Sequence, residues 1–188
     1  EGLSPLFLLK EAKGMSVKSE IYDWLQCIVV ALVASILIFV FIGRVIGVIG
    51  PSMVPTLEDG DMVVMSNLFY DPKQDDIVVF TKFSYDSNPL VKRVIAVENQ
   101  TVDINFVTGE VWVDGELLDE PYIADLTRRQ YDIEFPVTVP PGSVFVMGDN
   151  RMVSYDSRAS AIGMVDERCI LGKVYAVIAP LKNFGAVS

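Results

Sequence analysis

The chain has 188 residues, 51% of them apolar, with a formal net charge of −10 and no histidine. This length accommodates one compact domain beyond a hydrophobic segment. The acidic balance argues against a nucleic-acid partner, because phosphate binding needs a basic surface. The lack of histidine excludes a Ser-His-Asp triad and a Cys-His pair.

The first predicted element is a transmembrane helix over residues 24–42. From Trp24 to Ile42, only Gln26 and Ser35 are polar and no residue is charged. At 1.5 Å per residue this stretch spans about 28 Å, close to the roughly 30 Å of a bilayer's hydrocarbon core. A buried core helix is the alternative, but such a helix is rarely apolar on all sides. We expect the segment to be retained as an anchor, since the apolar part of a cleaved signal sequence is shorter.

Residues 1–23 form an N-terminal segment that bears on the orientation of this span. Three lysines precede the span and Arg44 follows it. Basic residues are thus more numerous before the span than after it. This predicts a single-pass protein of the cell membrane, with a cytoplasmic N-terminus and an extracytoplasmic domain. If the native chain begins at Met15, residues 1–14 leave the count and one basic residue remains on each side. The orientation of the span must then be inferred from the function of the domain that follows it.

Residues 44–188 are predicted to form one mostly β domain, an antiparallel sheet or barrel-like arrangement without a helix of normal length. Short apolar runs alternate there with Gly, Pro, Asp and Asn. The pair Asp114-Gly115 is a strong signal for a type I′ hairpin. The expected strands cover Met62 to Met65, Ile77 to Lys82, Leu90 to Val97, Val111 to Val113, Glu116 to Leu118, Val144 to Met147 and Lys173 to Ile178. A single helical turn is possible over residues 165–168.

Charge and cysteine content limit the domain's partners further. Residues 44–188 carry 12 basic and 21 acidic residues, which argues against electrostatic adhesion to anionic lipid. Cys27 lies in the hydrophobic stretch and Cys169 near the C-terminus. The domain therefore has no disulfide from its own residues, and the redox compartment stays open.

Ser52 follows the span closely, and lysine is the natural base for a serine in a chain without histidine. Burial can lower the pKa of a lysine and leave a neutral amine that accepts the serine proton. Lys92 lies in a strand-like run in which alternation places it between Leu90 and Val94 on one face. A pKa near 7 or 8 there would cost the charged form roughly 3 to 5 kcal/mol. Most strand lysines are instead solvated edge residues.

Four blocks, in order, resemble the bacterial type I signal peptidases, in their short, single-span, Gram-positive-like form. The blocks are Ser52-Met53-Val54-Pro55-Thr56-Leu57 with Gly60-Asp61, Asp76-Ile77-Val78-Val79-Phe80, Val91-Lys92-Arg93-Val94-Ile95, and Gly148-Asp149-Asn150-Arg151-Met152-Val153-Ser154-Tyr155-Asp156-Ser157-Arg158. The resemblance implies a Ser-Lys dyad in which Ser52 is the nucleophile and Lys92 the general base.

The resemblance also implies supporting roles. Ser154 would hydrogen-bond the lysine amine, and Asp156 and Arg158 would form an ion pair near the site; a surface pair of little energetic value is the alternative. We expect Asp149 to bind backbone in a turn. Many family members have a serine at the position of Gly50, so the oxyanion hole here would rely on backbone N–H groups, chiefly that of Ser52.

The implied substrates are preproteins whose signal peptides lie in the lipid bilayer and present a cleavage site after small residues. The anchor would hold Ser52 near that site. The peptide would bind extended beside existing strands, and Met53, Leu57 and Val91 are the proposed pocket residues, with core packing as the alternative for Leu57. No metal or cofactor is required. The identity of the preproteins and the oligomeric state stay open.

Two other functions remain as alternatives. The first is a noncatalytic, signal-peptidase-like assembly factor for surface proteins, although such relatives lack the lysine. The second is a self-cleaving Ser-Lys regulator, which would need a DNA-binding segment that the chain does not contain.

Overall fold

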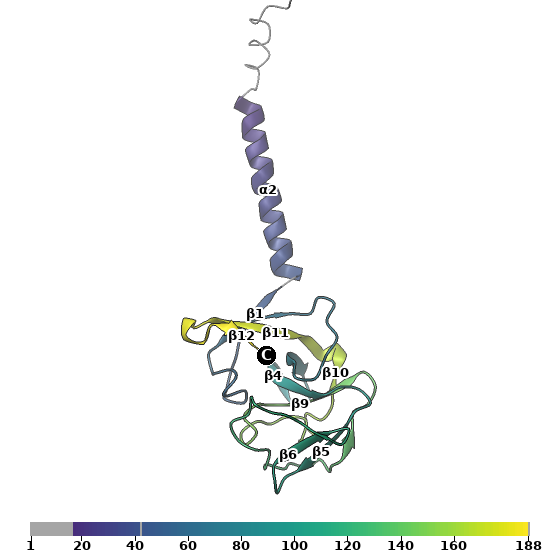
Figure 1. The fold of residues 1–188 in the computed structure, drawn as a ribbon. Helices are drawn as coiled ribbons and strands as arrows, with labels where there is room; N and C mark the ends of the chain where they lie inside the picture. The colour runs from purple at the N-terminus through teal and green to yellow at the C-terminus, as the bar shows by residue number, and fades with distance from the viewer. Residues whose placement is uncertain (1–16, 42, 188) are drawn as a thin grey trace, which may run out of the picture. The chain divides into compact units, whose positions relative to one another are not determined.

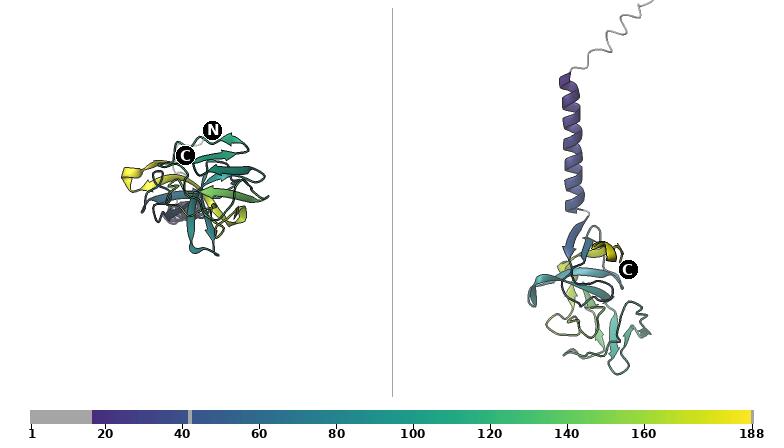
Figure 2. Two further views of the ribbon diagram at one scale, coloured as in Figure 1. Left: turned by 90° about the horizontal axis from the view of Figure 1, so that it is seen from below. Right: turned by 90° about the vertical axis from the view of Figure 1, so that its left-hand side faces the viewer.

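The computed structural model describes residues 17–41 and 43–187, which form two units that are treated separately. The first unit holds one helix, α2, from Val17 to Phe41, drawn as one unbroken rod in Figures 1 and 2. The predicted span lies within it, except that Ile42 falls outside the described residues, as does most of the predicted N-terminal segment 1–23. Every side chain from Glu20 to Leu37 is exposed, unlike those of a core helix.

The second unit is almost entirely β, as predicted. Its strands are β1 (Arg44–Gly47), β2 (Met62–Ser66), β3 (Ile77–Lys82), β4 (Asp86–Ala96), β5 (Thr101–Asn105), β6 (Glu110–Val113), β7 (Glu116–Leu117), β8 (Val137–Thr138), β9 (Ser143–Met147), β10 (Val165–Asp166), β11 (Ile170–Ala179) and β12 (Gly185–Ala186). Two short 3₁₀ turns, Glu167–Cys169 and Leu181–Asn183, are its helical elements among the described residues.

The strands form two antiparallel sheets. The larger sheet has the order β1-β2-β11-β3-β4-β9-β10, with β12 paired to β11, and the smaller sheet has the order β7-β6-β5-β8. In Figure 1, β5 and β6 lie at one end of this unit and β1 and β12 at the other. Within the described residues neither sheet closes, so the barrel-like alternative does not apply.

Local sequence signals explain much of this arrangement. The β6–β7 hairpin turns at Asp114 and Gly115, whose φ values of 52° and 82° are those of the predicted type I′ turn. All seven predicted strands are present, with shifts at their ends. The sequence analysis missed β1, β5, β8, β10 and β12, most of which are too short to show alternation.

The core consists of three apolar clusters that meet at β4. Val91 belongs to a cluster shared with β2, β3 and β11, and Ile95 to one shared with the smaller sheet. Leu90 and Val94 pack into a third cluster with β3, β9 and β11. The C-terminal half of β4 is therefore buried on both faces, which places any polar side chain there out of solvent.

Candidate active site

Ser52 lies in a tight turn that follows β1. Val48 donates its N–H to Asp61 O and accepts from Gly60 N, at 2.7 and 3.0 Å, so the chain returns along itself around the turn. Met53 and Leu57 are four residues apart and have no exposed surface, and Leu57 N donates to Met53 O at 2.9 Å. These two side chains hold the turn in the core and leave the partly exposed Ser52 at its outer side.

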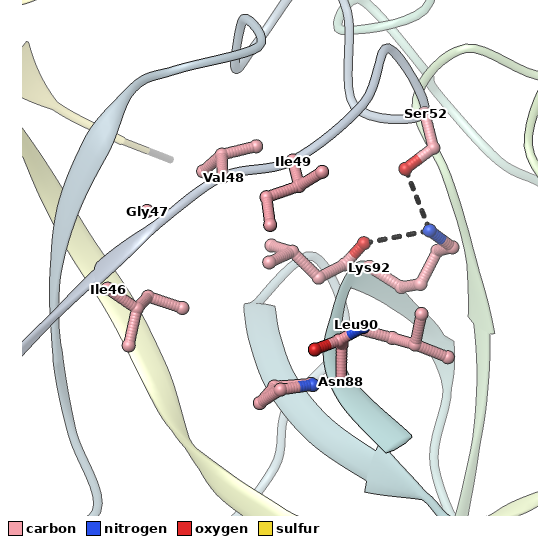
Figure 3. A pocket seen from close by; sticks show the side chains of 10 residues that line it. Ile46, Gly47, Val48, Ile49, Ser52, Asn88, Leu90 and Lys92 are labelled. Carbon is pink, nitrogen blue, oxygen red and sulfur yellow. Dashed lines mark hydrogen bonds between the residues drawn. The ribbon is translucent and has the colours of Figure 1, made fainter. Parts of the chain in front are cut away.

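Lys92 is brought to Ser52 by β4. Its side chain is 4% exposed, and its strand register pairs it with Val78 of β3. The Lys92 Nζ atom lies 2.8 Å from Ser52 Oγ and donates to Val91 O at 3.0 Å (Figure 3). Two residues that are 40 positions apart in the sequence are thus in hydrogen-bond contact.

The environment of Lys92 favours its neutral form. Burial lowers the pKa of Lys92 to about 8, against the opposing effects of Asp156 and Asp149, which raise it, while Arg158 lowers it further. Within the described residues, the amine has no carboxylate partner at ion-pair distance. A substantial fraction of this lysine is therefore an uncharged amine at mildly alkaline pH.

Asp156 and Arg158 form a buried ion pair near Lys92. Arg158 Nε donates to Asp156 Oδ1 at 2.8 Å, and both side chains have no exposed surface, which excludes the alternative of a surface pair. Asp156 also accepts from Gly148 N at 3.0 Å and from Ser154 Oγ at 2.7 Å. The pair thereby holds the loop that follows β9.

The predicted hydrogen bond from Ser154 to the lysine amine is not present in the structure. Ser154 Oγ donates instead to Asp156, because an ionised carboxylate is a stronger acceptor for a hydroxyl. Ser154 still lies at the site, since a Cβ added to Gly148 would come within 2.4 Å of Ser52 O and 2.3 Å of Ser154 Oγ. Only glycine fits between these two residues.

A second buried ion pair was missed by the sequence analysis. Arg93 Nε and Nη2 donate to the two carboxylate oxygens of Asp149 at 2.9 and 2.8 Å, and the guanidinium lies 3.8 Å from the ring centre of Tyr122. Thr56 Oγ1 donates to Asp149 at 2.5 Å. The Asp149 carboxylate therefore binds side chains, whereas the sequence analysis expected it to bind backbone. The available signal was alternation, which puts Arg93 on a buried face opposite Lys92.

Asn150 joins this loop to the turn that carries Ser52. Its N–H donates to Ser52 O at 3.1 Å, and its side-chain amide donates to Pro51 O at 3.1 Å. The sequence analysis gave Asn150 no role. These contacts, with that of Thr56, fix the position of the Ser52 backbone from the opposite side of the site.

Gly50 adopts φ of +85°, and its N–H donates to Asp59 Oδ1 at 2.7 Å. That conformation strains any residue with a side chain, which accounts for glycine at this position. Among the described residues, the Ser52 N–H donates to no acceptor. It is therefore free to bind another acceptor, and its role in an oxyanion hole stays a prediction.

A cleft of about 320 Å³ leads to Ser52 and Lys92. Residues 46–49 line one side, and residues 88–92, including Val91, line the other (Figure 3). Met53 and Leu57 are not among the lining residues, and direct contact with a substrate requires exposed surface that they lack. In the described chain, no group of three acidic, Cys or His side chains is placed to hold a metal ion.

The family model described as "Signal peptidase, peptidase S26" matches residues 21–179 of the chain. The chain belongs to this family. Family membership and the curated relatives indicate a type I signal peptidase, a serine endopeptidase that acts on signal-peptide-bearing preproteins.

Individual relatives match over most of their length. A signal peptidase I of Bacillus licheniformis is 32% identical over 185 residues, covering 93% of this chain and 97% of the relative. A probable signal peptidase I-1 of Synechocystis is 38% identical over 168 residues, covering 84% and 82%. A crystal structure of a signal peptidase I from Enterococcus faecalis V583 is 28% identical, with a TM-score of 0.46, covering 55% of this chain and 97% of that one.

Proposed function

We propose that this enzyme removes signal peptides from exported preproteins with a Ser52–Lys92 dyad, and cuts after small residues. The observation that carries the proposal is the buried, unpaired amine of Lys92 at 2.8 Å from Ser52 Oγ, at the end of an open cleft. A nucleophile within hydrogen-bond reach of a base of lowered pKa is the arrangement that covalent catalysis requires.

The chemistry proceeds in two steps. The neutral Lys92 amine takes the proton from Ser52 Oγ, which attacks the scissile carbonyl carbon, while the Ser52 N–H stabilises the oxyanion. The ammonium then protonates the leaving amine, and an ester of Ser52 with the signal peptide remains. Lys92 next deprotonates a water molecule, which attacks the ester; the Lys92 ammonium returns this proton to Ser52 Oγ as the ester bond breaks, and the signal peptide leaves with a free carboxylate.

Two unpaired strand edges favour an extended substrate. In the described chain, β1 pairs only with β2, and the pairing of β4 with β9 begins at Arg93. The cleft lies between these edges, so a peptide strand can add to them through backbone hydrogen bonds. Alternate side chains of that strand would enter the cleft, and its small volume favours small ones.

The helix α2 is the proposed anchor. Its 25 residues span about 37 Å, enough to cross the hydrocarbon core, and its apolar side chains from Glu20 to Leu37 are exposed. We place the N-terminus in the cytoplasm and residues 44–188 outside, where preproteins emerge. Labelling of an engineered cysteine, Ser87→Cys, in intact cells checks this orientation; protection from an impermeant reagent contradicts it.

Cleavage by the purified chain in detergent tests the function directly. A preprotein should be cut after a small residue, and Ser52→Ala should abolish the cut. Ser84→Ala, on an exposed turn, is the matched control and should leave the rate unchanged. An assembly factor would leave the preprotein intact, and a self-cleaving regulator would cut only its own chain; either result contradicts the proposal.

A further inference from the structure

The strand that lines one side of the cleft is supported on only one side. Residues 86–92 of β4 pair with β3 and, within the described chain, with no strand on the other side. The cleft-lining residues 88–92 belong to this segment. An edge with a single neighbour has more freedom to move, so its position relative to Ser52 depends on other contacts.

Those contacts come from three tyrosine rings, here called the tyrosine ladder. Tyr85, at the tip of the β3–β4 hairpin, stacks on Tyr155 with ring centres 5.2 Å apart and an interplanar angle of 15°. Tyr155 meets the edge of Tyr131 at 4.9 Å and 79°. Both geometries are those that aromatic quadrupoles favour.

The ladder ends on the loop that supports the dyad. Tyr155 lies between Ser154 and Asp156, which are both fully buried, and the Tyr131 hydroxyl donates to Ser154 O at 2.8 Å. The Arg158 guanidinium lies 5.4 Å from the ring centre of Tyr131. The tip of the hairpin is thus attached to the most firmly held part of the site.

A second contact runs inside the same hairpin. Leu90 lines the cleft and packs, with Tyr155, into the apolar cluster shared by β3, β9 and β11. The hydroxyl groups of Tyr85 and Tyr155 make no hydrogen bond among the described residues, so these two tyrosines contribute through their rings.

We propose that the tyrosine ladder positions the free edge of β4 and thereby sets the affinity of the enzyme for the extended segment of its substrate. The inference rests on the proposed function, because it assumes that the peptide adds to this edge. Tyr85 and Tyr155 act as positioning residues: they hold the binding edge and leave the distance between Ser52 and Lys92 unchanged.

The experiment uses the full chain in detergent and compares ring removal with hydroxyl removal. Tyr85→Ala should raise KM for a preprotein about fivefold, the value of one aromatic pair, with kcat nearly unchanged, and Tyr155→Ala, which also loses the contact with Tyr131, should raise KM by at least as much. Tyr85→Phe and Tyr155→Phe should match the unaltered enzyme. Phe83→Ala is the control for a lost ring, since Phe83 lies on the same turn, is 80% exposed and has no aromatic partner in the described chain.

Hydrogen exchange of the free enzyme gives an independent readout. The amides of residues 86–88 and 90 should exchange faster in Tyr85→Ala than in Tyr85→Phe, while those of β9 stay protected. The double variant Tyr85→Ala/Tyr155→Ala should add little to Tyr155→Ala, because the loss of the Tyr155 ring already removes the contact with Tyr85.

Three results would overturn the inference. They are an unchanged KM in Tyr85→Ala, a fall in kcat at constant KM, and exchange at residues 86–90 that does not respond to loss of the ring. Failure of the unaltered chain to cleave any preprotein would instead count against the proposed function, and the exchange measurement would still decide whether the ladder holds the edge.

Discussion

Lys92 and Arg93 are adjacent basic residues on β4, and they differ in whether a carboxylate lies beside them. The two side chains are 4% and 1% exposed, on opposite faces of the strand. Arg93 pairs with both oxygens of Asp149, whereas Lys92 contacts the Ser52 hydroxyl and a backbone carbonyl.

Equal burial therefore has opposite chemical results. A buried cation with a carboxylate partner stays charged and holds structure, and one without a partner becomes able to release its proton. The guanidinium cannot deprotonate in any case, so the order of the two residues along the strand matters. The unpaired position is the one proposed to be reactive.

The largest expected effect comes from placing a guanidinium at the unpaired position. Lys92→Arg keeps a cation but has no neutral form at accessible pH, so kcat/KM should fall by about 10⁴-fold or more. The cleavage rate of a preprotein measures it, and circular dichroism checks that the variant is folded. Near-normal turnover by Lys92→Arg or Lys92→Ala would remove Lys92 from the role of base.

Removing one member of the Arg93–Asp149 ion pair should reduce stability instead. Arg93→Met leaves Asp149 buried without its partner, and the free energy of unfolding should fall by about 3 to 5 kcal/mol. Urea denaturation of a chain without the span measures this change, provided that it folds. The double variant Arg93→Met/Asp149→Leu should recover much of the loss, since no unpaired charge remains; a further loss in the double variant would contradict this account.

The same substitution at Lys92 should have the opposite sign. The pKa of Lys92 is lowered from 10.5 to about 8 in the folded chain, so the unfolded chain binds more protons between these values. Lys92→Met should then raise the free energy of unfolding by up to about 3 kcal/mol below pH 8, and the gain should shrink toward pH 10.5. Denaturation at several pH values measures the gain. Destabilisation by Lys92→Met at neutral pH would show that burial does not disfavour the charged form of the amine.

The smallest expected effect concerns the pH dependence of the unpaired amine. The rate should rise with pH through about 8 as Lys92 deprotonates. Because Asp156 raises the pKa of Lys92 and Arg158 lowers it, Asp156→Asn should move this rise to lower pH and Arg158→Met to higher pH. The measurement is the pH at the midpoint of the rise in kcat/KM, which can be compared between variants even when their maximal rates differ. Shifts of the same sign in both would contradict the assigned causes.

The sequence was sufficient for the longer elements. The uniform apolar stretch gave the helix, and Asp114-Gly115 gave a hairpin because both residues adopt positive φ readily. Strand β8 escaped notice, since its two residues show no alternation and their pairing with β5 depends on a neighbour distant in sequence. The sequence predicted antiparallel β structure but left open whether it is a sheet or barrel-like; within the described residues the structure has two open sheets.

The site was predicted unevenly. Ser52 and Lys92 were found because the absence of histidine and the family resemblance narrowed the choice of base, and the structure places them in contact. Met53 and Leu57 were assigned to the pocket because proximity to Ser52 in sequence does not reveal which side of the turn is buried. The contacts of Arg93 and Asn150 span 56 and 98 or more positions, beyond any local pattern.

By itself, the sequence determined the apolar helix, the β character of the remainder and the two groups available for serine chemistry, because these follow from residue type and local order. The tertiary structure alone decided that Lys92, unlike Arg93, lacks a carboxylate partner. It also decided that the edges of β1 and β4 stay unpaired beside Ser52, and that the tyrosine ladder lies next to β4. These outcomes depend on long-range packing, since the pKa of a side chain and the pairing of an edge are set by neighbours in space.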